Sequence, residues 1–531
     1  MKNRVWKILS PLALAALSLC SCAGETTPSG TGYWTEKQDN AGGSVFYEIF
    51  VGSFSDSNGD GVGDLKGIEE KLDYLQDLGV SYLWLTPIHP SNTYHKYNVD
   101  DYYAVDSSFG TLADFDSLTA AAKDHGIGII LDMVFNHTGV TSTWFNNFCQ
   151  AIRSQDKASK YYDNFSVART QQDGYTMIGS AGCYVETNFD SSMPELNFDS
   201  EYVREELKNI QNFWLDHGAA GFRYDAVKYY YCTNSQGNIT GDNEKNLEAM
   251  TYLANCAKAK KADVYLVGEN WVEDISNIAY LAQSGMNGFN FPTCGLTAAG
   301  SVGKMVTKGG ESQFSAAVSA HQAALKESGA ELCYFVSNHD MDRWGKYRNG
   351  LKLGAEARKC MASAYLLTPG TPFMYYGEEI SMLGDRGSND RTDAMRRQAM
   401  VWGEGDTHLC NQPERYTVKE QTEDSVKAAL EDPWSALSHY KKVLSIRNKY
   451  KDLFRKGTFE ALDVGTARAA GFKITWNNEV YYLVHNTNSA EESIALSGAA
   501  SILEEIDTNQ IPAKFASGSL TLGAYSSALL K

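Results

Sequence analysis

Positive charge is scarce in this chain. Its 531 residues include 47 Lys and Arg against 65 Asp and Glu, which gives a net charge of −18. Proteins that bind nucleic acid present a basic surface to the phosphate backbone, so this balance argues against nucleic acid as a partner. An acidic excess is typical of a soluble domain, and it also suits a groove for cations or neutral polyols.

Proline is rare as well, with 11 residues, whereas hydrophobic residues reach 43% and aromatic residues 12%. This composition excludes disordered and collagen-like classes, which are poor in apolar residues or rich in proline. A chain of this kind buries a large core. A single (β/α)8 barrel, which needs about 250 residues, would account for roughly half of it.

Long apolar runs are missing after the first 22 residues, and none there could cross a membrane. Lys2, Arg4 and Lys7 precede an apolar run over 8–19. A basic start followed by a short apolar segment is typical of a secretory signal peptide, predicted here over 1–22.

Residues 19–22 read Leu-Cys-Ser-Cys and resemble a bacterial lipobox. This resemblance makes Cys22 the lipidated first residue of the exported protein. Residues 23–43 are rich in Gly, Ser and Thr and predict a flexible tether. We therefore expect the protein to be lipid-anchored to the cell envelope, at the cell surface or outer membrane.

Paired cysteine motifs are also absent, since no two of the ten cysteines form a CxxC. A structural zinc site is therefore not expected. Export permits disulfides, although scattered cysteines are equally typical of buried free thiols. Cys149 with Cys183 is the pair that merits a test.

Short apolar runs alternate with amphipathic stretches through the middle of the chain. Eight predicted strands with intervening helices, such as 65–78, 201–217 and 434–448, fit an α/β fold, a (β/α)8 TIM barrel, better than an open sheet. The predicted strands are 45–50, 80–86, 127–134, 220–225, 264–268, 288–291, 332–337 and 373–376.

Two segments interrupt or follow this pattern. Residues 136–200 show weak periodicity and predict a subdomain inserted after the third strand, so the barrel comprises 44–135 and 201–450. The last part, 451–531, has short alternating runs, including 519–530, and predicts a C-terminal β-sandwich.

Four carboxylates stand at the ends of predicted strands: Asp132, Asp225, Glu269 and Asp340. One acidic residue after a strand is more often a helix N-cap than a catalyst. In a barrel, however, the carboxyl ends of all strands face one mouth, so four such residues converge. The sequence therefore predicts an acidic active site at this mouth.

The surrounding motifs DMVFNH (132–137), MPELNF (193–198), GFRYDAVK (221–228), GENW (268–271) and FVSNHD (335–340) resemble the α-amylase clan, glycoside hydrolase family 13. The resemblance implies that Asp225 is the nucleophile, Glu269 the general acid/base, and Asp340 the carboxylate that orients the sugar. Arg223, two residues from Asp225 on the same strand face, is expected to lower the pKa of the nucleophile.

The same resemblance implies a set of substrate contacts. Histidines around the mouth would bind sugar hydroxyls, and Tyr97 would stack on the ring at the cleavage site. The implied substrate-binding residues are His95, Tyr97, His137, Arg223, Lys228, Trp271 and His339.

One departure concerns a metal. Many relatives have Lys-His after the nucleophile, and the His backbone there helps to bind calcium, whereas this chain has Lys228-Tyr229. A backbone carbonyl survives the substitution. A calcium with Asn136 as a ligand thus stays open beside the alternative, an Asn that only holds the loop.

A stronger calcium signal lies in DSNGDGVGD (56–64). Asp56, Asn58, Asp60, the Val62 carbonyl and Asp64 match positions 1, 3, 5, 7 and 9 of an EF-hand loop. Position 12 is Gly67 instead of Glu, so the EF-hand is incomplete. The loop resembles the calcium loop of oligo-1,6-glucosidase and neopullulanase-like members; the alternative is an Asp/Gly-rich turn without metal.

Together these features predict an α-amylase-type enzyme that cleaves internal α-1,4 bonds of starch and maltooligosaccharides. Ala226 supports α-1,4 specificity by family resemblance, whereas MPELN resembles the neopullulanase type. A neopullulanase, α-glucosidase or transglycosylase is therefore the alternative, and a non-catalytic surface glycan-binding protein is the alternative from another class. Other cell-surface glycan-uptake proteins are possible partners.

Overall fold

The structure is a computed structural model. It describes residues 41–531 except 296–297, 344–352, 387–391, 416–420, 423 and 466–467. The predicted signal peptide, the lipidated Cys22 and most of the tether lie outside the described residues.

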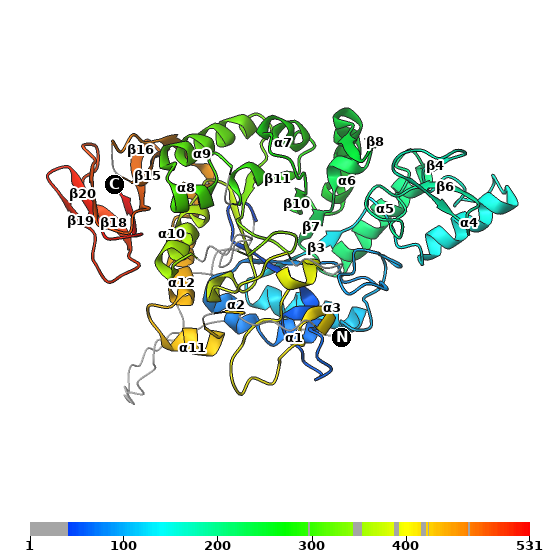
Figure 1. Cartoon of the computed structure of the whole chain (residues 1–531), viewed down its shortest axis with the longest axis horizontal. Coiled ribbons are helices and arrows are strands. Elements are labelled where there is room, and N and C mark those ends of the chain that lie inside the picture. Colours follow the sequence, from blue (N-terminus) through cyan, green and yellow to red (C-terminus); the bar gives the residue numbers. More distant parts are fainter. Residues whose placement is uncertain are drawn as a thin grey trace, which may run out of the picture. The chain divides into compact units, whose positions relative to one another are not determined.

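Eight parallel strands close into a barrel in the order β1-β13-β12-β11-β10-β7-β3-β2 (Figure 1). The predicted barrel is confirmed, and each predicted strand overlaps an observed one. Strand β1 pairs with both β2 and β13, which closes the sheet. The barrel strands are β1 (Phe46–Ile49), β2 (Tyr82–Leu85), β3 (Gly128–Met133), β7 (Gly221–Tyr224), β10 (Tyr265–Gly268), β11 (Asn287–Phe289), β12 (Leu332–Tyr334) and β13 (Thr371–Tyr375).

Aromatic side chains fill the barrel. The ring centroid of Phe46 lies 4.7 Å from Tyr82, 4.4 Å from Tyr265 and 4.5 Å from Phe373. Inward-facing residues of several strands thus pack in a layer, as expected for a barrel whose interior is a core and not a pore. This packed interior forms the floor beneath the strand ends.

Helices surround the barrel. The predicted helix over 65–78 is wrong in one respect, because Lys71 departs from helical geometry (φ −106°, ψ 10°) and divides it into α1 and α2. There Lys71 forms an ion pair of 2.8 Å with Asp406. The main helices are α1 (Leu65–Glu69), α2 (Leu72–Leu78), α3 (Leu112–Asp124), α5 (Glu201–Asp216), α6 (Asn243–Lys260), α7 (Ile275–Ala282), α8 (Val302–Lys308), α9 (Glu311–Leu325), α10 (Ala355–Leu366), α11 (Val426–Glu431), α12 (Ala436–Lys449) and α13 (Lys451–Lys456).

The segment between β3 and α5 forms a small unit of its own. It contains α4 (Thr143–Ser154) and a sheet of order β4-β6-β5, formed by β4 (Val167–Ala168), β5 (Tyr175–Ile178) and β6 (Cys183–Glu186). The sequence analysis missed a hairpin after the fourth barrel strand, β8 (Cys232–Ser235) with β9 (Asn238–Gly241).

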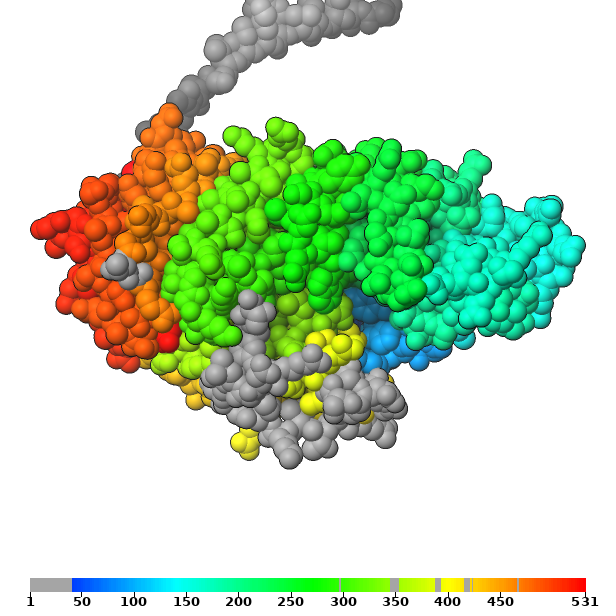
Figure 2. All heavy atoms as spheres, turned by 45° about the horizontal axis from the view of Figure 1, so that its top comes forward, coloured from blue at the N-terminus to red at the C-terminus, as the bar shows by residue number. Residues whose placement is uncertain are grey.

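Two antiparallel sheets form the C-terminal part, in the orders β14-β15-β16-β21-β18 and β17-β20-β19. The run 519–530 is not one strand, because Tyr525 turns the chain (φ +55°) and its halves enter different sheets. In Figure 2 these strands (orange to red) and the inserted segment (cyan) lie on opposite sides of the green barrel helices. The strands are β14 (Thr458–Ala461), β15 (Ala469–Trp476), β16 (Glu479–Asn486), β17 (Glu492–Ala495), β18 (Ile502–Ile506), β19 (Lys514–Ala516), β20 (Ser519–Leu522) and β21 (Ser527–Leu530).

Within the described part of the chain, no helix combines the length and the apolar character that a membrane span requires.

Candidate active site

The four predicted carboxylates meet at the carboxyl ends of the barrel strands. Asp132 lies at the end of β3, Asp225 directly after β7, and Glu269 directly after β10. Asp340 follows β12 after a short loop. Because all eight strands run in parallel, these residues from distant parts of the sequence reach one mouth, as predicted.

Arg223 joins three of the four carboxylates. Its Nη1 donates to Asp132 Oδ1 at 2.7 Å and to Asp225 Oδ1 at 2.6 Å, and its Nη2 lies 3.0 Å from Glu269 Oε1. The guanidinium is buried, with 1% of its residue surface exposed, and stacks 5.1 Å from the Trp84 ring. A single buried cation thus holds Asp225 and Glu269 on the same side of the site.

Burial sets the pKa values of these two carboxyls. It raises the pKa of Asp225 to about 6, although Arg223 lowers it, and Asp132 adds to the rise. The expectation that Arg223 keeps this pKa below its ordinary value is therefore wrong in net sign, because desolvation outweighs the cation. Burial also raises the pKa of Glu269, against the lowering effect of Arg223.

Asp340 is held by two cations instead. His339 Nε2 lies 2.9 Å from Asp340 Oδ2, and Arg397 Nη2 donates to Asp340 Oδ1 at 2.7 Å. Burial raises the pKa of Asp340, but His339 and Arg397 bring it well below its ordinary value. Asp340 is therefore ionised at any working pH.

His339 owes its charge to two acids. Burial lowers its pKa, but Asp340 and Glu48 raise it to about 10. Nδ1 of His339 donates to Glu48 Oε1 at 2.5 Å. Neither Glu48 nor Arg397 was predicted from the sequence. A charged residue within the apolar run FYEIF (46–50) was the available signal for Glu48.

Tyr97 links the two groups of acids. Its hydroxyl donates to Asp132 Oδ2 at 2.9 Å and lies 2.7 Å from His339 Nε2. Since His339 is protonated, its Nε2 donates to this hydroxyl. The Tyr97 ring stacks on that of His339 at 5.3 Å.

His95 and His137 lie beside Tyr97. Nδ1 of His95 accepts from the Tyr97 backbone N–H at 3.1 Å, and Nε2 of His137 lies 3.2 Å from the Tyr97 carbonyl. Burial lowers the pKa of His95 to about 3 and that of His137 to about 4. Both imidazoles are neutral at physiological pH, which suits contacts to uncharged hydroxyl groups.

A cleft of about 860 Å³ opens above these residues. Of the predicted substrate-binding residues, His95, Tyr97, His137, Lys228 and Trp271 line it, whereas Arg223 and His339 lie beneath without lining it. The sequence analysis did not predict the lining residues Tyr94, Phe189, Tyr229, Arg397 and Glu414.

Aromatic rings flank the cleft. Trp271 is 42% exposed and stacks on Phe291 at 4.9 Å, and its carbonyl accepts a hydrogen bond from Lys228 Nζ. Phe189 is 44% exposed and contacts Tyr229 edge to face at 5.2 Å. These exposed rings offer stacking surfaces for sugar rings.

The cleft has a neighbour. A second cleft of about 490 Å³ shares Tyr94 and Glu414 with it and extends past Phe109 to the 56–64 loop. Because Tyr94 and Glu414 line both, the two clefts adjoin each other.

The predicted calcium loop has a compact structure. Asp56 and Asp64 are buried, and their carboxylates accept only N–H and O–H groups of the described residues, such as Gly61 N at 2.6 Å and Gly67 N at 2.6 Å. Gly61 takes a positive φ of +89°, as the sharp turn requires. Burial raises the pKa of the Cys410 thiol, and Asp56, Asp64 and Asp60 add to the rise.

The oxygens of the 56–64 loop fit a hard cation such as calcium. The buried carboxylates of Asp56 and Asp64 have no positive partner among the described residues, and such carboxylates favour a bound cation. The carboxylates of Asp56, Asp60 and Asp64 are too far apart to coordinate one ion in the present geometry. Among the described residues, three acidic, Cys or His side chains have all their ligand atoms within 4.8 Å of one another at a different place.

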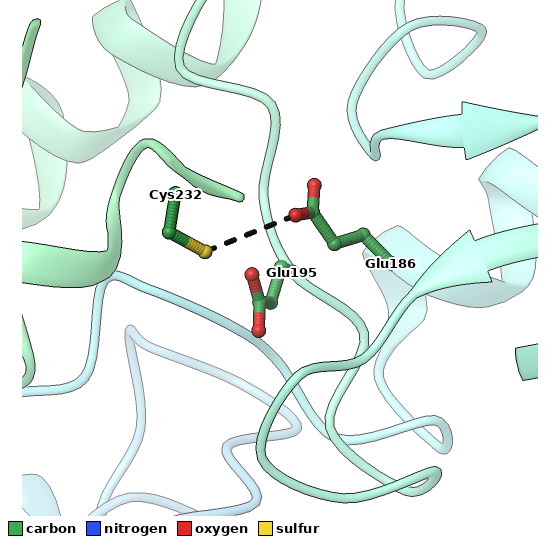
Figure 3. A group of neighbouring side chains, drawn as sticks. All are labelled: Glu186, Glu195 and Cys232. Carbon is green, nitrogen blue, oxygen red and sulfur yellow. Dashed lines mark hydrogen bonds between the residues drawn. The ribbon is translucent and has the colours of Figure 1, made fainter. Parts of the chain in front are cut away.

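That group comprises Glu186, Glu195 and Cys232 (Figure 3). The Cys232 thiol points at Glu186, with Sγ 4.0 Å from Oε1. Burial and then Glu186 raise the pKa of Glu195 to about 8. Both polar side-chain atoms of the buried Asn136 lack a hydrogen-bond partner among the described residues.

The described cysteines are all free. Cys149 and Cys183 are not bonded to each other, and burial and then Cys149 raise the pKa of the Cys183 thiol. Cys149 is buried, and its Sγ lies 3.5 Å from Ser180 Oγ. The structure therefore favours the buried-thiol alternative for this pair.

Comparisons with known proteins agree with the site. The family "Alpha amylase, catalytic domain" matches residues 48–457. "Alpha-amylase 3" of Dictyoglomus thermophilum is 32% identical over 495 residues, covering 92% of this chain and 93% of the relative. An "Oligo-1,6-glucosidase" of Halalkalibacterium halodurans is 28% identical over 530 residues, covering 86% and 90%. The solved structure of Eubacterium rectale Amy13B matches with a TM-score of 0.84 at 34% identity, over 92% of this chain and 95% of that one.

Proposed function

The chain belongs to the alpha-amylase family, glycoside hydrolase family 13, and is a glycosidase that acts on α-glucans, and we propose that it cleaves internal α-1,4 bonds of starch and maltooligosaccharides with retention of the anomeric configuration. The resemblance inferred from the motifs is confirmed. The observation that carries the proposal is the Arg223 guanidinium, which contacts Asp225 and Glu269 at 2.6 and 3.0 Å. Retaining glycosidases require two carboxyl groups only about 5–5.5 Å apart, and one shared cation supports such a separation.

In this mechanism Asp225 attacks the anomeric carbon while Glu269 protonates the departing oxygen. The glycosyl group is then bound to Asp225 as an ester. In the second step Glu269, now ionised, takes a proton from water, whose oxygen bonds to the anomeric carbon while the bond to Asp225 breaks and frees its carboxylate. The raised pKa of Glu269 supports its role as acid. Its Oε2 accepts the Ala226 backbone N–H at 3.0 Å, which orients the carboxyl beside the nucleophile.

Asp340 is proposed to bind sugar hydroxyls. Its carboxylate is kept ionised by His339 and Arg397, so it accepts hydrogen bonds in both steps. Neutral His95 and His137 would bind further hydroxyls. Lys228 and Trp271 would contact the part of the chain that leaves.

The second cleft, which adjoins the active-site cleft, supports cleavage of internal bonds. The adjoining cleft, reached past Tyr94 and Glu414, gives a glucan room to continue beyond the carboxylates. An enzyme that removes terminal units needs a pocket closed at one end. Ala226 also lines the cleft with its small side chain, which the family resemblance associates with α-1,4 bonds.

The alternative is activity on α-1,6 bonds or transglycosylation. The relatives named oligo-1,6-glucosidase favour it, at 28% identity for one from Halalkalibacterium halodurans. Products from amylose, pullulan and panose, resolved by anomeric form, decide between the two. Internal α-1,4 cleavage gives short oligosaccharides from amylose, whereas release of glucose together with maltose from panose, which requires cleavage of its α-1,6 bond, would favour the alternative. The Asp225→Asn protein is the matched control for contaminating activity.

We also propose that calcium binds Asp56, Asn58, Asp60, the Val62 carbonyl and Asp64. When bound, it would stiffen the loop between β1 and α1 and take no part in the chemistry. A further calcium near Asn136, which the family resemblance keeps open, would find carboxylates in Glu186 and Glu195.

Export and lipidation at Cys22 remain part of the proposal. They would place the enzyme on the cell envelope, where starch and long maltooligosaccharides are met. Other cell-surface glycan-uptake proteins would then receive its products.

A further inference from the structure

A separate cleft of about 640 Å³ lies between the α11–α12 segment and the C-terminal sheets. It shares no lining residue with the active-site cleft. Trp434 and Lys442 line it from the barrel side, and Asp507 and Gln510 line it from the C-terminal side. Helix α12 packs against β18, which fixes the two walls (Figure 1). Its volume is in the range of small-ligand sites.

Trp434 gives this cleft an aromatic platform. The residue is 37% exposed, and in the described part of the chain its ring has no stacking or cation partner. Its backbone is fixed at both ends, because the N–H donates to Asp432 Oδ1 at 2.8 Å and the carbonyl accepts from Lys359 Nζ. A partly exposed indole ring that lines a cleft and has no aromatic partner among the described residues is suited to stacking on the apolar face of a sugar.

Free polar groups surround the platform. The side chains of Lys442, Asp507 and Gln510 form no hydrogen bond or ion pair with any residue that the structure describes. They offer a donor, an acceptor, and an amide that is both. Such a set matches the adjacent hydroxyls of a sugar, each of which donates and accepts.

The charges of the cleft cancel. Lys359 and Lys442 balance Glu505 and Asp507, and burial lowers the pKa of His439 to about 3, so this ring is neutral. An anionic ligand such as a phosphate would need a positive excess. The cleft therefore favours a neutral, polyhydroxylated ligand with an apolar face.

We propose that this cleft is a second, non-catalytic binding site for an α-glucan chain, with Trp434 as its stacking residue. This assignment rests on the proposed function for the choice of sugar. The site would hold a long glucan on the enzyme while another part of the polymer occupies the active-site cleft. Short oligosaccharides would gain nothing from it.

Binding is measured by electrophoresis in gels containing amylopectin, with the Asp225→Asn protein as parent so that the polymer stays intact. Adding Trp434→Ala should weaken binding roughly 2- to 12-fold, the effect of one aromatic contact. The matched control is Leu430→Ala, which removes an exposed apolar side chain (51%) outside the cleft and should change nothing. In the active enzyme, Trp434→Ala should slow amylopectin hydrolysis and leave hydrolysis of a chromogenic maltotrioside unchanged.

Undiminished amylopectin binding by a folded Trp434→Ala protein overturns the site. If that variant loses its thermal transition, Asp507→Ala and Gln510→Ala are measured instead, and unchanged binding by both is equally decisive. Failure of the proposed function gives a different result: no α-glucan is hydrolysed, yet binding that depends on Trp434 persists.

Discussion

Glu48, in the first barrel strand, accepts a 2.5 Å hydrogen bond from Nδ1 of His339, 291 residues further along the chain. Both side chains are buried, at 2% and 0% exposure. His339 in turn donates toward Asp340 and Tyr97. Glu48 of β1 therefore fixes the charge and orientation of His339, a residue that lies far from it in the sequence and contacts two groups of the active site.

Glu48→Gln should destabilise the protein in a pH-dependent way. Removing one partner of a buried pair costs about 3–5 kcal/mol. The folded-state pKa of His339 is raised from 6.5 to about 10, so the stabilisation is fully present below pH 6.5 and is lost as pH rises through 10. Urea unfolding of both proteins at several pH values measures the difference. The control is Glu460→Gln, which breaks an exposed ion pair with Lys473 (3.2 Å) and should cost below about 1 kcal/mol at every pH. A constant difference up to pH 11 would contradict the role of His339.

The acid limb of kcat/KM should lie near pH 6. Asp225 must be ionised to attack, and burial raises its pKa to about 6, so activity is expected to fall tenfold per pH unit below that value. Because Asp225 and Glu269 interact, the profile reports values of the pair. A pH–rate profile on a soluble maltooligosaccharide measures it. A limb near pH 4, as for an exposed aspartate, would show that desolvation does not dominate.

Asp225→Asn and Glu269→Gln should each abolish most activity without unfolding the protein. An amide can neither attack nor give up a proton, and general acid–base catalysis alone contributes roughly 10²- to 10⁴-fold. NMR of fresh products should show the α-anomer first from the wild-type enzyme. Initial release of the β-anomer would refute double displacement.

Chelation of calcium should lower the melting temperature more than kcat at moderate temperature. Binding to the folded state alone adds about 2.7 kcal/mol at a hundredfold excess over Kd. Calorimetry with calcium and with chelator measures the effect. Asp60→Ala should reproduce it and respond little to added calcium, unless a site near Asn136 is also filled; Asp101→Ala, an exposed aspartate outside the loop, is the control. Identical melting curves in both buffers would leave 56–64 as a turn without metal.

Cys22→Ser should release the protein from membranes into the soluble fraction, because the Cys22 thiol is the attachment point of the proposed lipid anchor. Fractionation followed by activity measurements tests this, with Cys20→Ser as the matched control. Persistent membrane association of the Cys22 variant would contradict lipidation there.

The sequence was sufficient to predict the barrel and the convergence of Asp225, Glu269 and Asp340, because parallel strands bring their carboxyl ends to one mouth. The sequence did not predict that Arg397 contacts Asp340, because Arg397 lies in a loop beyond β13 with no periodic pattern around it. The pKa of Asp225 also escaped prediction, since its sign depends on how completely the surrounding atoms exclude water. The β8–β9 hairpin was missed because its strands are largely polar and half exposed.

The pairing of β1 with β13 also determines when the barrel can close during synthesis of the chain. A nascent chain that has emerged up to residue 340 already carries all four carboxylates of the mouth but has neither the eighth strand nor Arg397. Its first strand has no partner on one side, so Glu48 has no fixed place beside His339. The site is thus complete only when synthesis has passed residue 397, so no fragment that stops short of Arg397 contains the whole cleft.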